Sequence, residues 1–97
     1  MFTIGFTPEA SDDLQELRKF DQTLILDALD VQLVHQPGDE TRKRKKLRPN
    51  QLAEWELRID NFRVFYDIMT DANQVKIVAI GEKRGNKLYI RGQEYEL

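Results

Sequence analysis

The chain has 97 residues, of which 40% are hydrophobic and 33% charged, a composition that suits one small domain, residues 1–97, with a modest core. It contains no cysteine, which excludes disulfide scaffolds, thiol catalysis and cysteine-ligated zinc. No apolar run approaches the roughly 18 to 20 residues of a membrane span, and the start lacks the features of a signal peptide, so we expect a cytoplasmic protein with no membrane partner.

The charged residues are unevenly distributed along the chain, whose net charge is -2. Residues 1–41 hold two basic and nine acidic residues, a net charge of -7, whereas residues 42–97 hold thirteen basic and eight acidic residues, a net charge of +5. An acidic half followed by a basic half predicts a surface with one cationic side, to which an anionic molecule could bind.

The first part of the chain is predicted to form a strand and two helices. Apolar residues alternate with small ones over residues 2–6, which is the period of a strand. Thr7 and Pro8 suit a helix cap and a first helical turn. Apolar residues at helical spacing predict a second helix from about Gln22 to Val34, which Pro37-Gly38 ends.

A run of basic residues lies in the loop predicted over residues 36–50. Such a run either forms a solvated loop or acts as an electrostatic arm for the phosphates of a nucleic acid. On the second interpretation the RNA-binding residues of this loop are Arg42, Lys43, Arg44, Lys45, Lys46 and Arg48.

The rest of the chain has the alternating pattern of β-strands. It predicts strands over residues 55–59 and 62–68, joined by a two-residue turn at Asp60-Asn61. Strands over residues 75–80 and 88–90 follow. The order β-α-α-β-β-β-β indicates an α+β domain in which two helices cover one side of a mostly antiparallel sheet.

The register of the predicted hairpin brings two arginines together. A two-residue turn places Arg58 directly opposite Arg63 on the face away from the helices, which is unfavourable by a few tenths to about 1 kcal/mol. Either Glu56 on the same face or a bound phosphate would compensate, since guanidinium groups match the geometry of phosphate. Phe65 shares this face, where it would stack on an RNA base unless the C-terminal tail covers it.

Two stretches of the sequence resemble a known family. Residues 55–68, WELRIDNFRVFYDI, resemble the central hairpin of RelE/ParE-type toxins of bacterial toxin–antitoxin pairs. Ile80-Gly81, followed by a charged loop and Leu88-Tyr89, is similar to the closing segment of that family, and the order of elements over about residues 2–90 agrees. The resemblance implies a RelE-like fold and the toxin of a type II toxin–antitoxin system, held inactive by an antitoxin protein.

The resemblance also implies an activity, namely a metal-independent endoribonuclease that needs no cofactor and inhibits translation by cleaving ribosome-associated mRNA. In such enzymes the ribose 2′-hydroxyl attacks the adjacent phosphate, and cationic side chains stabilise the charge that develops. By position, Arg63 matches the arginine at the scissile phosphate, Lys83 or its neighbour Arg84 matches a cation of the closing loop, and Tyr89 matches a tyrosine placed for stacking or proton transfer.

The sequence departs from the family pattern at several positions. Glu54 and Glu56 stand where RelE carries two lysines, and the only histidine, His35, lies far from the C-terminus, where other branches have one. Two other interpretations therefore stay open. One is a ParE-like inhibitor of DNA gyrase, and the other is a catalytically weak binding protein with the RelE fold.

Overall fold

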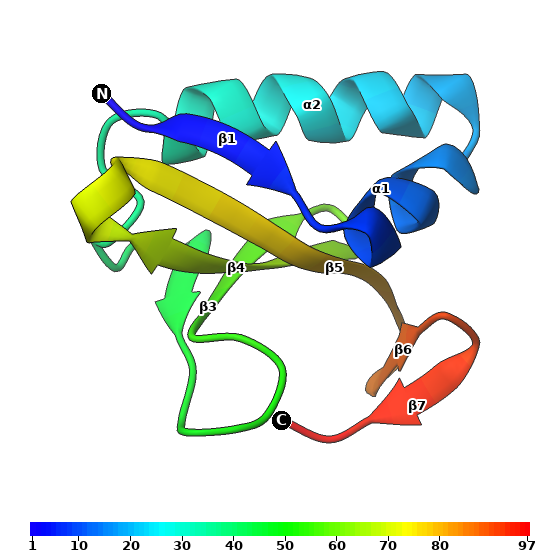
Figure 1. The fold of residues 1–97 in the computed structure, drawn as a ribbon. Helices are drawn as coiled ribbons and strands as arrows, with labels where there is room; N and C mark the ends of the chain where they lie inside the picture. The colour runs from blue at the N-terminus through cyan, green and yellow to red at the C-terminus, as the bar shows by residue number, and fades with distance from the viewer.

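Two helices lie on one face of a seven-stranded sheet in the computed structural model, which describes residues 1–97 (Figure 1). Strands β2 to β7 follow one another across the sheet as antiparallel neighbours, and β1 pairs in parallel with β5. This arrangement confirms the predicted α+β fold. Neither helix is long and apolar enough to cross a membrane. The elements are β1 (Thr3–Phe6), α1 (Pro8–Gln15), α2 (Lys19–Leu33), β2 (Arg44–Lys46), β3 (Trp55–Ile59), β4 (Phe62–Met69), the 3-10 turn η1 (Thr70–Ala72), β5 (Gln74–Arg84), β6 (Lys87–Ile90) and β7 (Gln93–Tyr95).

Strands extend into segments that were predicted as loop or tail. β2 lies inside the basic run, where the guanidinium of Arg44 donates hydrogen bonds to Gln32 O at 2.8 Å and to Asp39 O at 2.9 Å and so fixes the segment beside α2. β7 forms by pairing with β6 near the C-terminus. β5 continues four residues past its predicted end, so Lys83 and Arg84 belong to a strand and not to a loop.

The main core fills the space between the helices and the sheet. The β3–β4 hairpin has the predicted register, with Trp55 opposite Tyr66 and Leu57 opposite Val64. These four side chains are buried on the helix side, and a slip of one residue would turn all of them to the other face. Their partners on α2 are Ile25, Leu29 and Leu33.

A smaller apolar cluster covers the other face of the sheet. Phe65 is fully buried there, where it packs with Ala79 of β5 and with Leu88 and Ile90 of β6. Tyr95 of β7 packs against the same cluster. The interpretation of Phe65 as an exposed base-stacking residue is therefore wrong, because the C-terminal strands cover it.

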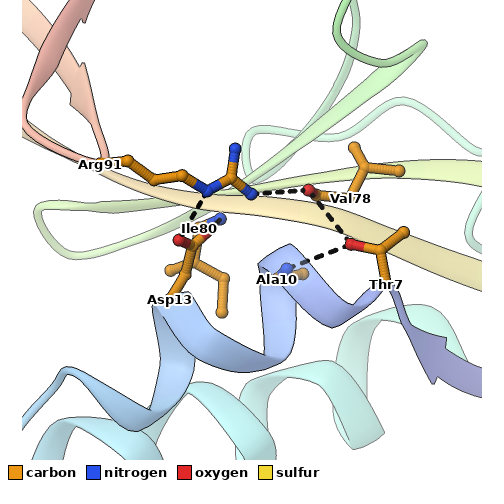
Figure 2. Close-up of polar contacts among 6 residues, drawn as sticks. All are labelled: Thr7, Ala10, Asp13, Val78, Ile80 and Arg91. Carbon is orange, nitrogen blue, oxygen red and sulfur yellow. Dashed lines mark hydrogen bonds and ion pairs between the residues drawn. The ribbon is translucent and has the colours of Figure 1, made fainter.

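A polar junction joins α1 to β5 and to the β6–β7 turn (Figure 2). The carboxylate of Asp13 accepts hydrogen bonds from Ile80 N at 3.1 Å and from Arg91 Nε at 2.9 Å. Arg91 Nη2 and the Thr7 hydroxyl both donate to Val78 O, at 3.2 and 3.5 Å. These side chains satisfy backbone groups of β5 between the end of its pairing with β1 and the start of its pairing with β6.

Gly81 marks a close approach of β5 and β6. A Cβ atom on Gly81 would lie 2.8 Å from Tyr89 O and 2.8 Å from Ile90 Cγ1. Because that oxygen is part of the backbone, we expect Gly81→Ala to lower the free energy of unfolding by about 1–3 kcal/mol in urea denaturation. Gly5→Ala is a matched control, since its Cβ would meet only the flexible end of Gln74. Equal stability of the two variants would contradict the prediction.

The buried hydroxyl group of Tyr66 leads to a prediction of how the stability of the protein depends on pH. Its hydroxyl donates a 2.7 Å hydrogen bond to Pro37 O. Burial raises the pKa of Tyr66, and the nearby charge of Arg44 opposes that rise. Since the folded state favours the neutral phenol, this contribution to stability is complete below the unfolded pKa, near 10, and is lost as the pH rises above it. Urea denaturation between about pH 9 and 11 should show a steeper loss for the wild type than for Tyr66→Phe, and equal slopes would argue against it.

Candidate functional site

Arg63 lies near the start of β4, on the face of the sheet away from the helices, and is only 7% exposed. Its Nη1 atom donates hydrogen bonds of 2.9 Å to Asp60 O and to Phe62 O, which fix the guanidinium at the β3–β4 turn. No other atom of this guanidinium donates to a protein acceptor. Every fully buried side-chain nitrogen or oxygen of the protein has a hydrogen-bond partner. Since the other two guanidinium nitrogens of Arg63 have none, they are not fully buried and reach solvent.

The charge of Arg63 is not neutralised by a contact. None of the four ion pairs of the protein includes it. Burial lowers the pKa of Arg63, the charge of Glu56 raises it, and the charge of Arg58 lowers it further. The fold therefore holds a partly desolvated cation that no carboxylate contacts, since Glu56 acts on it only at a distance. Such an arrangement costs stability and is typical of a site for an anion.

The register of the sheet brings other charged side chains to the same face. Arg58 lies directly opposite Arg63, as predicted, and Lys45 lies opposite Glu56. Lys83 lies two residues beyond the β5 partner of Arg63, and such diagonal neighbours are roughly 7–8 Å apart. We call this set the cationic face, which consists of Lys45, Arg58, Arg63 and Lys83, with Glu56 among them.

The sheet separates the four residues predicted as catalytic. Glu82 pairs with Phe62 on β4 and with Tyr89 on β6, so Tyr89 and Arg84 face α1. The guanidinium of Arg84 lies 5.2 Å from the centre of the Tyr89 ring and 3.4 Å from the Glu82 carboxylate. Arg84 and Tyr89 are thus on the opposite face from Arg63, and only Lys83 of the predicted set shares the face of Arg63.

The basic residues of the run 42–48 also differ in their exposure, since one is buried and the others are exposed. Arg44 is 8% exposed, and its guanidinium is occupied by Gln32 and Asp39, so Arg44 anchors β2 and is not available to RNA. That finding corrects its prediction as an RNA-binding residue. Lys45 is the member that strand register places on the cationic face. The exposed members of the run are Arg42, Lys43, Lys45, Lys46 and Arg48.

Comparison with known sequences decides the family. Residues 4–86 match the sequence model of the ParE toxin of type II toxin–antitoxin systems, parDE. The chain belongs to this family. No curated protein sequence matches it.

The fold of this ParE-family toxin is similar to that of three solved complexes. The RelBE2 toxin–antitoxin complex from Mycobacterium tuberculosis superposes with a TM-score of 0.72 and 23% identity over 84% of this chain and 98% of that chain. The archaeal RelE–RelB complex from Pyrococcus horikoshii OT3 superposes with a TM-score of 0.66 and 20% identity, over 87% of this chain and 96% of that chain. The intact E. coli RelBE complex superposes with a TM-score of 0.60 and 14% identity, over 87% of this chain and 99% of that chain. At these identities the similarity concerns the fold.

Two features of the site in this ParE-family toxin could not be found from the sequence. Lys45 reaches the cationic face because β2 pairs with β3, and an all-polar segment gives no alternation signal for that pairing. Glu56, one of the two groups expected to balance Arg58, makes no ion pair with Arg58 or Arg63, and its charge acts on Arg63 only at a distance. No group of acidic or histidine side chains is arranged to hold a metal ion.

Proposed function

We propose that this toxin is a metal-independent endoribonuclease that cleaves ribosome-associated messenger RNA in the cytoplasm and so inhibits translation. The observation that supports this proposal is the largely buried Arg63 guanidinium, which no carboxylate contacts and which lies opposite Arg58. An RNA phosphate would supply the missing negative charge and relieve the repulsion between the two arginines.

The cationic face suits transfer of a phosphate within the RNA strand. Arg63 and Arg58 hold the scissile phosphate, and the Glu56 carboxylate takes the proton of the ribose 2′-hydroxyl. The 2′-oxygen then bonds to phosphorus as the bond from phosphorus to the 5′-oxygen breaks, and the Lys83 ammonium gives a proton to that oxygen. The products are a 2′,3′-cyclic phosphate and a 5′-hydroxyl. Charge that builds up on the phosphate oxygens is stabilised by the two guanidinium groups.

Lys83 and Arg84 are consecutive residues of β5 whose side chains lie on opposite faces of the sheet, which gives a direct test of the proposal. We expect Lys83→Ala to slow cleavage of a translated message about 100-fold, because Lys83 shares the face of Arg63. Arg84→Ala, the matched control on the opposite face, should change the rate by less than about threefold. Purified protein, ribosomes and message would be compared by primer extension. Equal losses of cleavage rate in both variants, or a message left intact by the wild type, would overturn the proposal of a nuclease.

Inhibition of DNA gyrase through protein contacts is a second candidate function. It is favoured by the separation of Arg84 and Tyr89 from Arg63 and by the acidic residues Glu54 and Glu56 at family lysine positions. Loss of gyrase supercoiling in the presence of the toxin, with translated message intact, would select this function. A protein that affects neither process would instead be a binding protein with the toxin fold.

A cognate antitoxin is the proposed protein partner. The three similar structures are complexes of a toxin with its antitoxin, which supports extending such a partner to this chain. An acidic antitoxin segment would suit the cationic face, since opposite charges favour association there. Binding of the two proteins should then weaken as the salt concentration rises.

A further inference from the structure

A pocket of the protein lies on the side of the sheet opposite the cationic face. It measures about 620 Å³ and runs between α1 and the β5–β6 hairpin. Its apolar part is formed by Leu17, Phe62 and Ile80, and Tyr89 lies beside them. Five acidic side chains, two arginines and two glycines complete the lining, and we call this pocket the α1 groove.

Two arginines of the chain already occupy the wall of the α1 groove. Arg91 Nε lies 2.9 Å from Asp13 Oδ1, a contact drawn in Figure 2, and Arg84 Nη2 lies 3.4 Å from Glu82 Oε1. The Arg84 guanidinium also lies over the Tyr89 ring. The groove thus binds guanidinium groups by two means, carboxylate pairing and contact with an aromatic face.

Three carboxylates of the groove have no such partner. Glu9, Asp12 and Glu16 take part in none of the ion pairs of the protein. Their spacing of three and four residues places Glu9 and Asp12 on one face of α1 and Glu16, the C-cap residue, on the same side, over about 10 Å. An extended peptide covers that length in about three residues.

We propose that the α1 groove binds an extended segment of a protein partner that carries arginine side chains. The guanidinium groups of the segment pair with Glu9, Asp12 and Glu16, and one of them contacts Tyr89. The methylene stems pack on the apolar part of the groove. RNA is excluded by the excess of carboxylates. Because the sheet lies between the groove and the cationic face, the segment and an RNA strand occupy separate surfaces.

The test uses a blocked peptide, acetyl-Arg-Ala-Ala-Arg-Ala-Ala-Arg-amide, and its analogue with citrulline in place of each arginine. Calorimetric titration of the full chain should show binding of the arginine peptide that weakens with added salt, and no binding of the uncharged analogue. The variant Glu9→Gln/Asp12→Asn/Glu16→Gln should bind about tenfold more weakly. A control with the same change of charge at exposed, unpaired positions, Asp30→Asn/Asp71→Asn/Glu96→Gln, should stay within about twofold of the wild type.

Amide shifts in proton–nitrogen spectra locate the bound peptide and show that each variant is folded. Shifts confined to α1, β6 and the end of β5 support the proposal. Should the triple variant unfold, Tyr89→Leu keeps every carboxylate and is expected to bind about threefold more weakly. Equal binding of the citrulline peptide, an equal loss in the control variant, or no binding at millimolar peptide would each overturn it.

Discussion

Replacing Arg63 with methionine is expected to slow cleavage of translated message by about 100-fold or more while changing the free energy of unfolding by no more than about 1 kcal/mol. Most buried residues do not behave in this way, because removing them costs both activity and stability. Arg63 should separate the two because its charge is desolvated and unpaired in the folded protein.

The stability of Arg63→Met results from two opposing effects. The variant loses the hydrogen bonds from Nη1 to Asp60 O and Phe62 O, each with a net contribution of about 0.5–1.5 kcal/mol. It also removes a buried cation that lies opposite Arg58 and that no carboxylate contacts, which is favourable by a similar amount. The methionine side chain fills much of the same apolar volume.

Arg58→Met is the matched control, since it makes the same chemical change opposite Arg63 but at an exposed position. We expect a smaller loss of cleavage, about tenfold. Arg63→Lys keeps the charge and loses the two-pronged geometry, so it should recover only part of the activity. Urea denaturation and cleavage would be measured on the same preparations. A loss of several kcal/mol in Arg63→Met would mean that the arginine is structural and would remove the support for an anion site.

Asp13→Ala is expected to lower the free energy of unfolding by about 2–3 kcal/mol. The Asp13 side chain is only 8% exposed and accepts hydrogen bonds from Ile80 N and Arg91 Nε. Without it a backbone N–H of β5 loses its acceptor, at a cost of about 1–3 kcal/mol. Arg91 is 38% exposed, so solvent screens its ion pair and loss of that pair adds less than about 1 kcal/mol.

Three further variants locate the source of the Asp13 effect. Arg91→Ala should cost less than about 1 kcal/mol, because solvent replaces its partner. Asp13→Asn keeps an acceptor for Ile80 N and should lie between the two. Asp12→Ala, at the exposed neighbouring position, should cost no more than about 0.5 kcal/mol. If Asp12→Ala were as damaging as Asp13→Ala in urea denaturation, the polar junction would not be the cause.

The elements that were predicted well have strong apolar patterns. The register of the β3–β4 hairpin followed from its alternation and from a two-residue turn, and the structure confirms it. Helix α2 begins at Lys19, three residues before the predicted start, because no side chain caps it and the one apolar residue of its first turn, Phe20, is exposed and lies outside the apolar face. The short strands β2 and β7 were missed because they contain almost no apolar residues. Contacts with distant segments, such as the bonds of Arg44 to residues beside α2, decide where they form.

The site was predicted only in part, because some of its residues are placed by local pattern and others by contacts with distant segments. Hairpin geometry alone placed Arg58 opposite Arg63. The separation of Lys83 from Arg84 could not be predicted, because a side chain in a loop has no fixed direction, whereas in a strand neighbouring residues point to opposite faces. Phe65 was uncertain because the residues that bury it, Leu88, Ile90 and Tyr95, come from the end of the chain.

The placement of the α1 carboxylates and the cationic face on opposite sides of one sheet makes the molecule electrically asymmetric, with a permanent moment through its thickness. A polyanion would repel the protein as a whole, since its net charge is -2, yet would also rotate it so that Arg63 leads. Orientation before contact shortens the search for a productive encounter. Added salt, which reduces the screening length from about 10 Å at 0.1 M to about 3 Å at 1 M, should weaken both the overall repulsion and this orientation.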